Sequence, residues 1–147
     1  MKTSTRSAEA SDLDAIVAIE TAWPTSAGWT RGQFETELRN PRARFVVAEE
    51  DERVAAFAVF WAVPPEAQFL DLAVSPDRAR RGLGRFLLDA ALAHARRLNL
   101  KKDTLEVRAD NAPALALYTA AGFRVVGSRP KFYNGRVDAV LMDRDLL

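Results

Sequence analysis

Residues 68–97 have the sequence QFLDLAVSPDRARRGLGRFLLDAALAHARR, the strongest structural signal in the chain. Gln68 to Val74 is an apolar run typical of a β-strand, and Ser75 to Asp77 ends it. Gly82 and Gly84 then open a long helix with apolar residues along one face. The first N–H groups of a helix have no internal partners, so a basic glycine turn here suits a phosphate or pyrophosphate. The alternative is a solvated basic loop that binds nothing.

The amino-acid composition narrows the possible classes of protein and of ligand. The chain has 147 residues, 48% hydrophobic and 28% charged, which is the balance of one globular domain over residues 1–147. Lys and Arg total 21 against 20 Asp and Glu, so a net charge of +1 gives no general reason to bind nucleic acid or a membrane. With no Cys and one His, thiol chemistry is excluded and we expect no metal site. No targeting or membrane-spanning run is visible, so we expect a cytoplasmic protein.

Strand and helix patterns also alternate through the rest of the chain. Residues 45–49 and 54–63 predict a hairpin, and Thr30 with Gln33 predicts a capping box that opens a helix. The later predicted elements are a strand at 104–108, a helix at 111–122, and closing strands at 124–129 and 138–143. These patterns favour an α/β fold.

Three motifs together resemble the GNAT superfamily of N-acetyltransferases. They are QFLDLAV with RRGLG in residues 68–84, LEVRADN at 105–111, and ALALY followed by GF in residues 114–123. The last two resemble the RimI-type branch, whose members acetylate the N-terminal alanine of a small-subunit ribosomal protein. The resemblance implies a three-layer α/β/α domain with a mixed, mostly antiparallel sheet, and acetyl-CoA as co-substrate.

The resemblance places acetyl-CoA along the strand and the glycine turn. Backbone groups of the strand would pair with the pantetheine arm, and those of the turn would bind the pyrophosphate. Ala79 stands where the family usually has Gln or Arg, and Asn111 matches a residue that contacts the cofactor arm. A simple N-cap is the alternative role for Asn111. The implied cofactor-binding residues are Leu72, Ala73, Val74, Ala79, Arg80, Arg81, Gly82, Leu83, Gly84 and Asn111.

The resemblance also implies a base, Glu106, and an acid, Tyr118. Acetylation needs a neutral amine and a proton for the departing thiolate, which a carboxylate and a phenol can handle. An α-amine with a pKa near 8 needs roughly 3 kcal/mol less to deprotonate than a lysine near 10.4, so a single carboxylate favours an N-terminus. The alternatives are a Glu106–Arg108 pair on a solvated face and a Tyr118 that only packs in the core.

Trp29 and Tyr133 are the candidate acceptor-binding residues. Trp29 matches the family's first substrate loop, with packing at a helix start as the alternative. Tyr133 matches one of a tyrosine pair in RimI-type enzymes, whereas Val137 replaces an expected Glu. We therefore expect a monomer that acetylates a protein N-terminus directly in a ternary complex, since the chain has no Cys for an acyl-enzyme. The alternatives are acetylation of a lysine or small amine, and an acetyl-CoA-binding module without catalysis.

Overall fold

A seven-stranded sheet with the order β1-β2-β3-β4-β5-β7-β6 forms the centre of the protein. The structure is a computed structural model and describes residues 2–146. The strands are β1 (Thr3–Ser7), β2 (Ala43–Glu50), β3 (Arg53–Val63), β4 (Glu66–Val74), β5 (Lys102–Arg108), β6 (Arg124–Tyr133) and β7 (Val137–Asp145). The helices are α1 (Leu13–Thr21), α2 (Arg31–Arg39), α3 (Leu83–Arg97) and α4 (Ala112–Ala120), with 3-10 turns η1 (Ala10–Asp12) and η2 (Pro76–Arg78).

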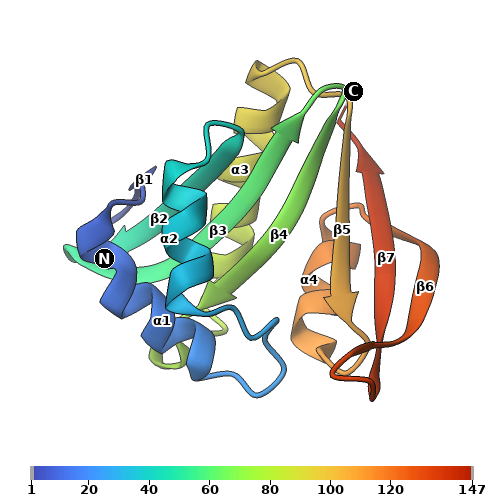
Figure 1. The fold of residues 1–147 in the computed structure, drawn as a ribbon. Helices are drawn as coiled ribbons and strands as arrows, with labels where there is room; N and C mark the ends of the chain where they lie inside the picture. The colour runs from blue at the N-terminus through green and yellow to red at the C-terminus, as the bar shows by residue number, and fades with distance from the viewer. Residues whose placement is uncertain (1, 147) are drawn as a thin grey trace.

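Helices cover both faces of the sheet. Figure 1 shows α1 and α2 in front of it and α3 and α4 behind it. Ile16 and Phe34 pack against one face of the sheet, and Leu88 and Leu92 pack against the other. Every strand pairing is antiparallel except that of β4 with β5. The prediction of a three-layer α/β/α fold with a mostly antiparallel sheet is confirmed. No helix between residues 2 and 146 combines the length and apolar character needed to cross a membrane.

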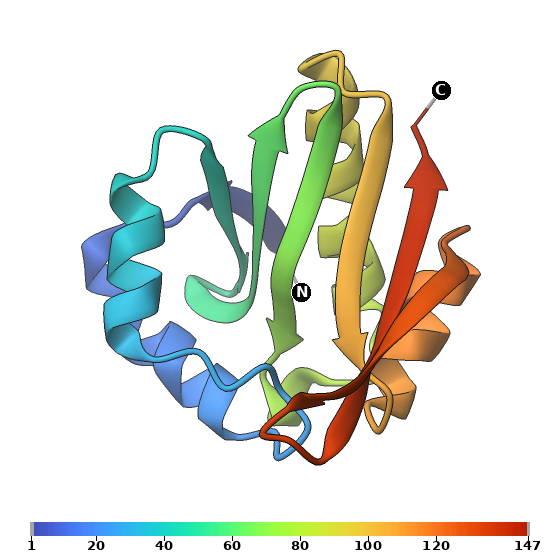
Figure 2. The same cartoon turned by 45° about the vertical axis from the view of Figure 1, so that its right-hand side comes forward.

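The parallel pair β4 and β5 separates halfway along its length. Pairing runs from Glu66 opposite Lys102 to Phe69 opposite Leu105 and then stops. On the other side of β4, the register with β3 shifts at Leu70, which makes this residue a β-bulge. Figures 1 and 2 both show the two strands together at one end of the sheet and apart at the other.

Two local features that the sequence predicts, a glycine turn and a capping box, are present in the structure. Gly82 has a φ of +81° and precedes the first residue of α3, which confirms the glycine turn. Thr30 Oγ1 accepts a hydrogen bond from the Gln33 N–H at 3.2 Å, and Gln33 Oε1 accepts from the Thr30 N–H at 2.8 Å, so the capping box is present. Strand β1 has no counterpart in the sequence predictions, because its TSTRS sequence lacks apolar alternation.

One buried acid in this fold yields a stability prediction. Asp103 is 0% exposed at the start of β5, and neither carboxyl oxygen has a hydrogen-bond partner among the described residues. Burial raises the pKa of Asp103 from its ordinary 3.8 to about 8. The folded protein therefore keeps a proton that the unfolded chain releases, and stability falls as the pH rises from about 4 to about 8, by at most about 1.4 kcal/mol per pH unit.

We expect Asp103→Asn to remove most of this pH dependence and to be more stable than the original protein at pH 8. Urea unfolding at pH 5, 6.5 and 8 measures both effects. Parallel stability profiles for the two proteins would show that Asp103 is already ionised in the fold.

Candidate active site

The separation of β4 from β5 opens a cleft of about 420 Å³. Its walls come from the second half of β4, the turn that leads into α3, the end of β5, the start of α4 and the loop between α1 and α2. Most of the site residues predicted from sequence line it. They are Leu72, Ala73, Val74, Ala79, Arg80, Gly82, Leu83, Gly84, Glu106, Asn111, Tyr118 and Tyr133. Arg81 and Trp29 do not line the cleft.

At one end of the cleft, the first turn of α3 provides a site for an anion. Gly82 caps the helix without a side-chain hydrogen bond, so the first N–H groups of α3 remain open to a ligand. A Cβ added at Gly82 would meet no atom within 4 Å, which leaves space for a phosphate above the turn. A Cβ at Gly84 would lie 3.4 Å from Val74 Cγ2 and 3.6 Å from Leu117 Cδ2, which are ordinary contact distances, so packing alone does not require glycine there. The turn therefore fits a pyrophosphate group.

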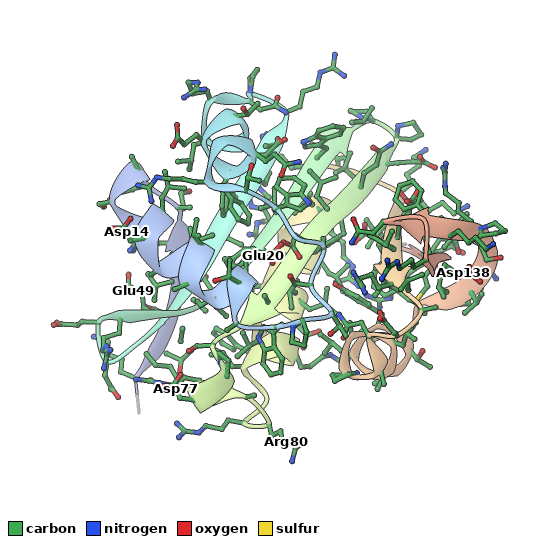
Figure 3. The ribbon with its side chains drawn as sticks, turned by 60° about the horizontal axis from the view of Figure 1, so that its bottom comes forward. Asp14, Glu20, Glu49, Asp77, Arg80 and Asp138 are labelled. Carbon is green, nitrogen blue, oxygen red and sulfur yellow. The ribbon has the colours of Figure 1, made fainter. Side chains whose placement is uncertain are left out.

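The arginines in this turn and at the start of α3 make different contacts. Arg78 forms an ion pair with the buried carboxylate of Glu50 at 2.8 Å, which anchors the turn to β2. Arg85 forms an ion pair with Asp89 at 2.9 Å, one helical turn further along α3. Arg80 lines the cleft, and Figure 3 shows its side chain pointing outward at the margin of the molecule. Arg80 is therefore the arginine best placed to meet an incoming phosphate.

The loop between α1 and α2 is tied to both walls of the cleft. Trp23 Nε1 donates a hydrogen bond to the Val74 carbonyl at 2.7 Å, at the end of β4. From the opposite wall, Asn111 Nδ2 donates to the Thr25 carbonyl at 3.3 Å. Asn111 Oδ1 also accepts from the Ala114 N–H at 3.2 Å, so Asn111 does cap α4. A pantetheine arm that pairs with β4 has to bind beside the Trp23 indole or displace it.

The other end of the cleft carries acids and phenols. Glu106 projects from β5 on the face opposite the buried Leu105 and Val107, and its Oε1 lies 3.0 Å from Arg129 Nε. The alternative pairing of Glu106 with Arg108 is wrong. Arg108 forms an ion pair with Asp110 at 2.9 Å, and its guanidinium lies 5.5 Å from the centre of the Tyr133 ring.

Both tyrosines are held in the neutral form. Burial, followed by the charges of Asp71 and Asp103, raises the pKa of Tyr118 far above its ordinary value. Burial, followed by the charges of Glu106 and Asp71, raises the pKa of Tyr133 to about 12. A neutral phenol is a hydrogen-bond donor. The acceptor end of the cleft thus combines a carboxylate with two phenolic donors.

Trp29 lies apart from this group. Its ring packs against Phe34 with the ring centres 5.4 Å apart, and its backbone N–H donates to Glu20 Oε2 at 2.9 Å. Its place in the core between α1, α2 and the sheet agrees with the packing alternative.

Sequence reasoning missed three neighbours of the site: Trp23, Asp71 and Arg129. The sequence does contain a sign of Asp71, because it is an acidic residue within an otherwise apolar strand. No sequence pattern points to Arg129, because its contact with Glu106 depends on the position of β6 at the edge of the sheet.

The profile of the acetyltransferase (GNAT) family matches residues 11–123. The chain belongs to the GNAT acetyltransferase family. Enzymes of this family transfer an acetyl group from acetyl-CoA, which agrees with the anion site at the start of α3. Within residues 2–146, no group of three or more His, Asp or Glu side chains is arranged to hold a metal ion.

The similar proteins cover almost the whole chain. The [ribosomal protein bS18]-alanine N-acetyltransferase of Escherichia coli K12 is 35% identical over 142 residues, which is 92% of this chain and 93% of that protein. The crystal structure of the Escherichia coli ribosomal-protein-S18-alanine N-acetyltransferase superposes with a TM-score of 0.87 at 33% identity, over 99% of this chain and 94% of that one. Ard1 from Thermoplasma volcanium has a TM-score of 0.90 at 27% identity, over 100% of this chain and 99% of that one.

The placement of Arg80 predicts a moderate role in binding acetyl-CoA. We expect Arg80→Ala to raise the KM for acetyl-CoA about two- to fivefold, the range of an exposed charge contact, and to leave kcat unchanged. The effect should shrink as salt is added, because ions screen exposed charges. Arg97→Ala, at an exposed arginine in the last turn of α3, is the control. Equal KM values for the two variants would mean that Arg80 does not contact the phosphates.

Proposed function

We propose that this protein transfers the acetyl group of acetyl-CoA to the N-terminal α-amine of a protein, and that its acceptor is a ribosomal protein of the bS18 type that begins with alanine. The observation that carries the proposal is the composition of the cleft. An anion site lies at one end, and Glu106 lies with two neutral phenols at the other. The similarity to alanine N-acetyltransferases over nearly the whole chain supports the same acceptor.

In the proposed reaction, the chain first has to provide a neutral amine. Glu106 accepts a proton from the α-ammonium, directly or through a water molecule, and the amine then attacks the acetyl carbonyl. Acetyl-CoA supplies the activated thioester. Because the pairing of β4 with β5 ends at Phe69 and Leu105, the free edge of β4 can align an extended arm toward Glu106.

The departing thiolate then needs a hydrogen-bond donor. Tyr118 lines the cleft from α4, on the face of the sheet opposite Glu106, and its raised pKa keeps the hydroxyl protonated. The Tyr118 hydroxyl therefore stabilises the negative charge on sulfur mainly by donating a hydrogen bond. The nitrogen releases a second proton when the amide forms, and the thiolate takes up one proton to become the thiol, so the protons balance.

We also propose that the protein acts as a monomer. A ribosomal-protein acceptor would place the reaction in the cytoplasm.

The assignment of Glu106 predicts a large kinetic effect. We expect Glu106→Gln to lower turnover of the peptide at pH 7 by about a hundredfold or more, with an unchanged KM for acetyl-CoA. The lost rate should return in part as the pH rises, because the amine then deprotonates without a base. Arg129→Ala breaks the same ion pair and keeps the carboxylate, so it separates loss of the base from loss of the pair. Unchanged turnover of Glu106→Gln at pH 7 would refute the assignment.

The acceptor class can be tested by mass spectrometry. A peptide that begins with alanine and contains an internal lysine is incubated with the protein and acetyl-CoA, beside the same peptide with a blocked N-terminus. We expect one acetyl group on the free α-amine and none on the blocked peptide. Acetylation of both peptides would identify a lysine acetyltransferase, and acetylation of neither would refute the proposal for peptide acceptors.

A further inference from the structure

Two carboxyl groups meet behind the acceptor end of the cleft. Glu20, in the last turn of α1, is 0% exposed, and its Oε2 accepts the Trp29 N–H at 2.9 Å. Its Oε1 and the Oδ2 of Asp71 are both buried without a hydrogen-bond partner among the described residues, and the two carboxyl groups are close enough for the charge of Glu20 to act on Asp71. Figure 3 shows Glu20 over the middle of the sheet, within the interior of the molecule.

Two neighbouring carboxyl groups that are shielded from water disfavour the state in which both are ionised. This arrangement favours a pair that shares one proton and keeps one negative charge, and a shared proton would satisfy both unpartnered oxygens. Burial, followed by the charge of Glu20, raises the pKa of Asp71 well above its ordinary value. In the part of the chain that the structure describes, no salt bridge involves either carboxyl group. No described cation therefore lies within ion-pair distance of the negative charge on this pair.

The β-bulge determines where this charge lies. Because Leu70 is an extra residue, Asp71 shares with Ala73 the face of β4 that is covered by α1. Glu106 projects on the same side of β5, just beyond the last residue pair between the two strands. Asp71 lines the cleft directly before Leu72, and its charge raises the pKa of both Tyr118 and Tyr133. The pair thus lies at the strand separation, on the side of the sheet from which Glu106 projects.

We propose that the Glu20–Asp71 pair is the binding site for the positive charge of the acceptor, and that it holds the ammonium group at the strand separation before Glu106 removes the proton. This assignment rests on the proposed function. Asp71 Oδ1 has the Leu72 N–H as its hydrogen-bond donor at 3.0 Å, and a carboxylate oxygen can accept a second donor from an ammonium group. A buried charge without a partner is unfavourable, so a bound cation relieves it. The ligand class is a primary ammonium.

Three variants move or remove the charge without changing the size of the side chains. In Glu20→Gln the amide donates to Asp71, so the whole charge lies on the residue that lines the cleft. In Asp71→Asn the amide donates to Glu20, so the charge moves away from the cleft. The double variant carries no charge. We expect the KM for the alanine peptide to be lower in Glu20→Gln, several-fold higher in Asp71→Asn and at least tenfold higher in the double variant.

Binding without reaction isolates the effect of charge. The affinity of the protein saturated with CoA is measured by calorimetry at pH 7 for the alanine peptide, whose α-amine is mostly protonated. The comparison ligand is the same peptide with lactic acid in place of the alanine, which carries a neutral hydroxyl. We expect the original protein to bind the amine at least tenfold more tightly than the hydroxyl, and the double variant to bind both equally. The KM for acetyl-CoA should stay within about twofold.

Asp103→Asn is the matched control, because it makes the same substitution at a buried Asp on the opposite face of the sheet. It should keep the preference for the amine. If the double variant also keeps the preference, or loses affinity for both peptides equally, the charge assignment is wrong even where the original protein acetylates the peptide. If the original protein neither binds nor acetylates the peptide, the proposed function and this assignment both fail.

Discussion

The divergence of β4 from β5 is the constraint on which the rest of the site depends. The two strands pair in parallel only as far as Phe69 and Leu105, and the bulge at Leu70 then turns β4 away. A parallel pair needs a crossover connection, which α3 supplies, so the N-terminus of this helix lies where β4 ends. One irregularity therefore places a free strand edge, a helix N-terminus and an opening through the sheet side by side. Tyr118 reaches that opening from one face, and Glu106 from the other.

Charge is sorted along the cleft, although the chain as a whole is nearly neutral. The start of α3 and Arg80 offer positive charge at one end. At the other end Glu106 and the Glu20–Asp71 pair offer carboxyl groups, and the two arginines nearby are already paired, Arg108 with Asp110 and Arg129 with Glu106. This order matches a reaction between an anionic co-substrate and a cationic acceptor. The net charge of +1 conceals it, because opposite charges cancel in the sum and not in space. Composition could therefore exclude a general polyanion partner, but it could not reveal this division.

The parts of the fold that were predictable from sequence are those with local causes. The capping box at Thr30 and the glycine turn at Gly82 need only neighbouring residues, and the structure has both. Strand β1 depends instead on pairing with β2, far along the chain, and its polar sequence gives no sign of it. The ion partner of Glu106 illustrates the same limit. Arg108 is the nearer residue along the strand, yet Asp110 binds it and leaves Glu106 to Arg129.

Two buried acids show why a residue type alone does not define a role. Asp103 is fully buried without a second carboxyl beside it, so it becomes neutral by keeping its proton. Asp71 meets a second carboxyl, and one proton cannot neutralise both groups. The same Glu20 also holds the loop between α1 and α2 through the Trp29 N–H. The charge of the pair and the loop that joins both walls of the cleft are thus held by one side chain, so a change at Glu20 that removes its hydrogen bonds would alter both together.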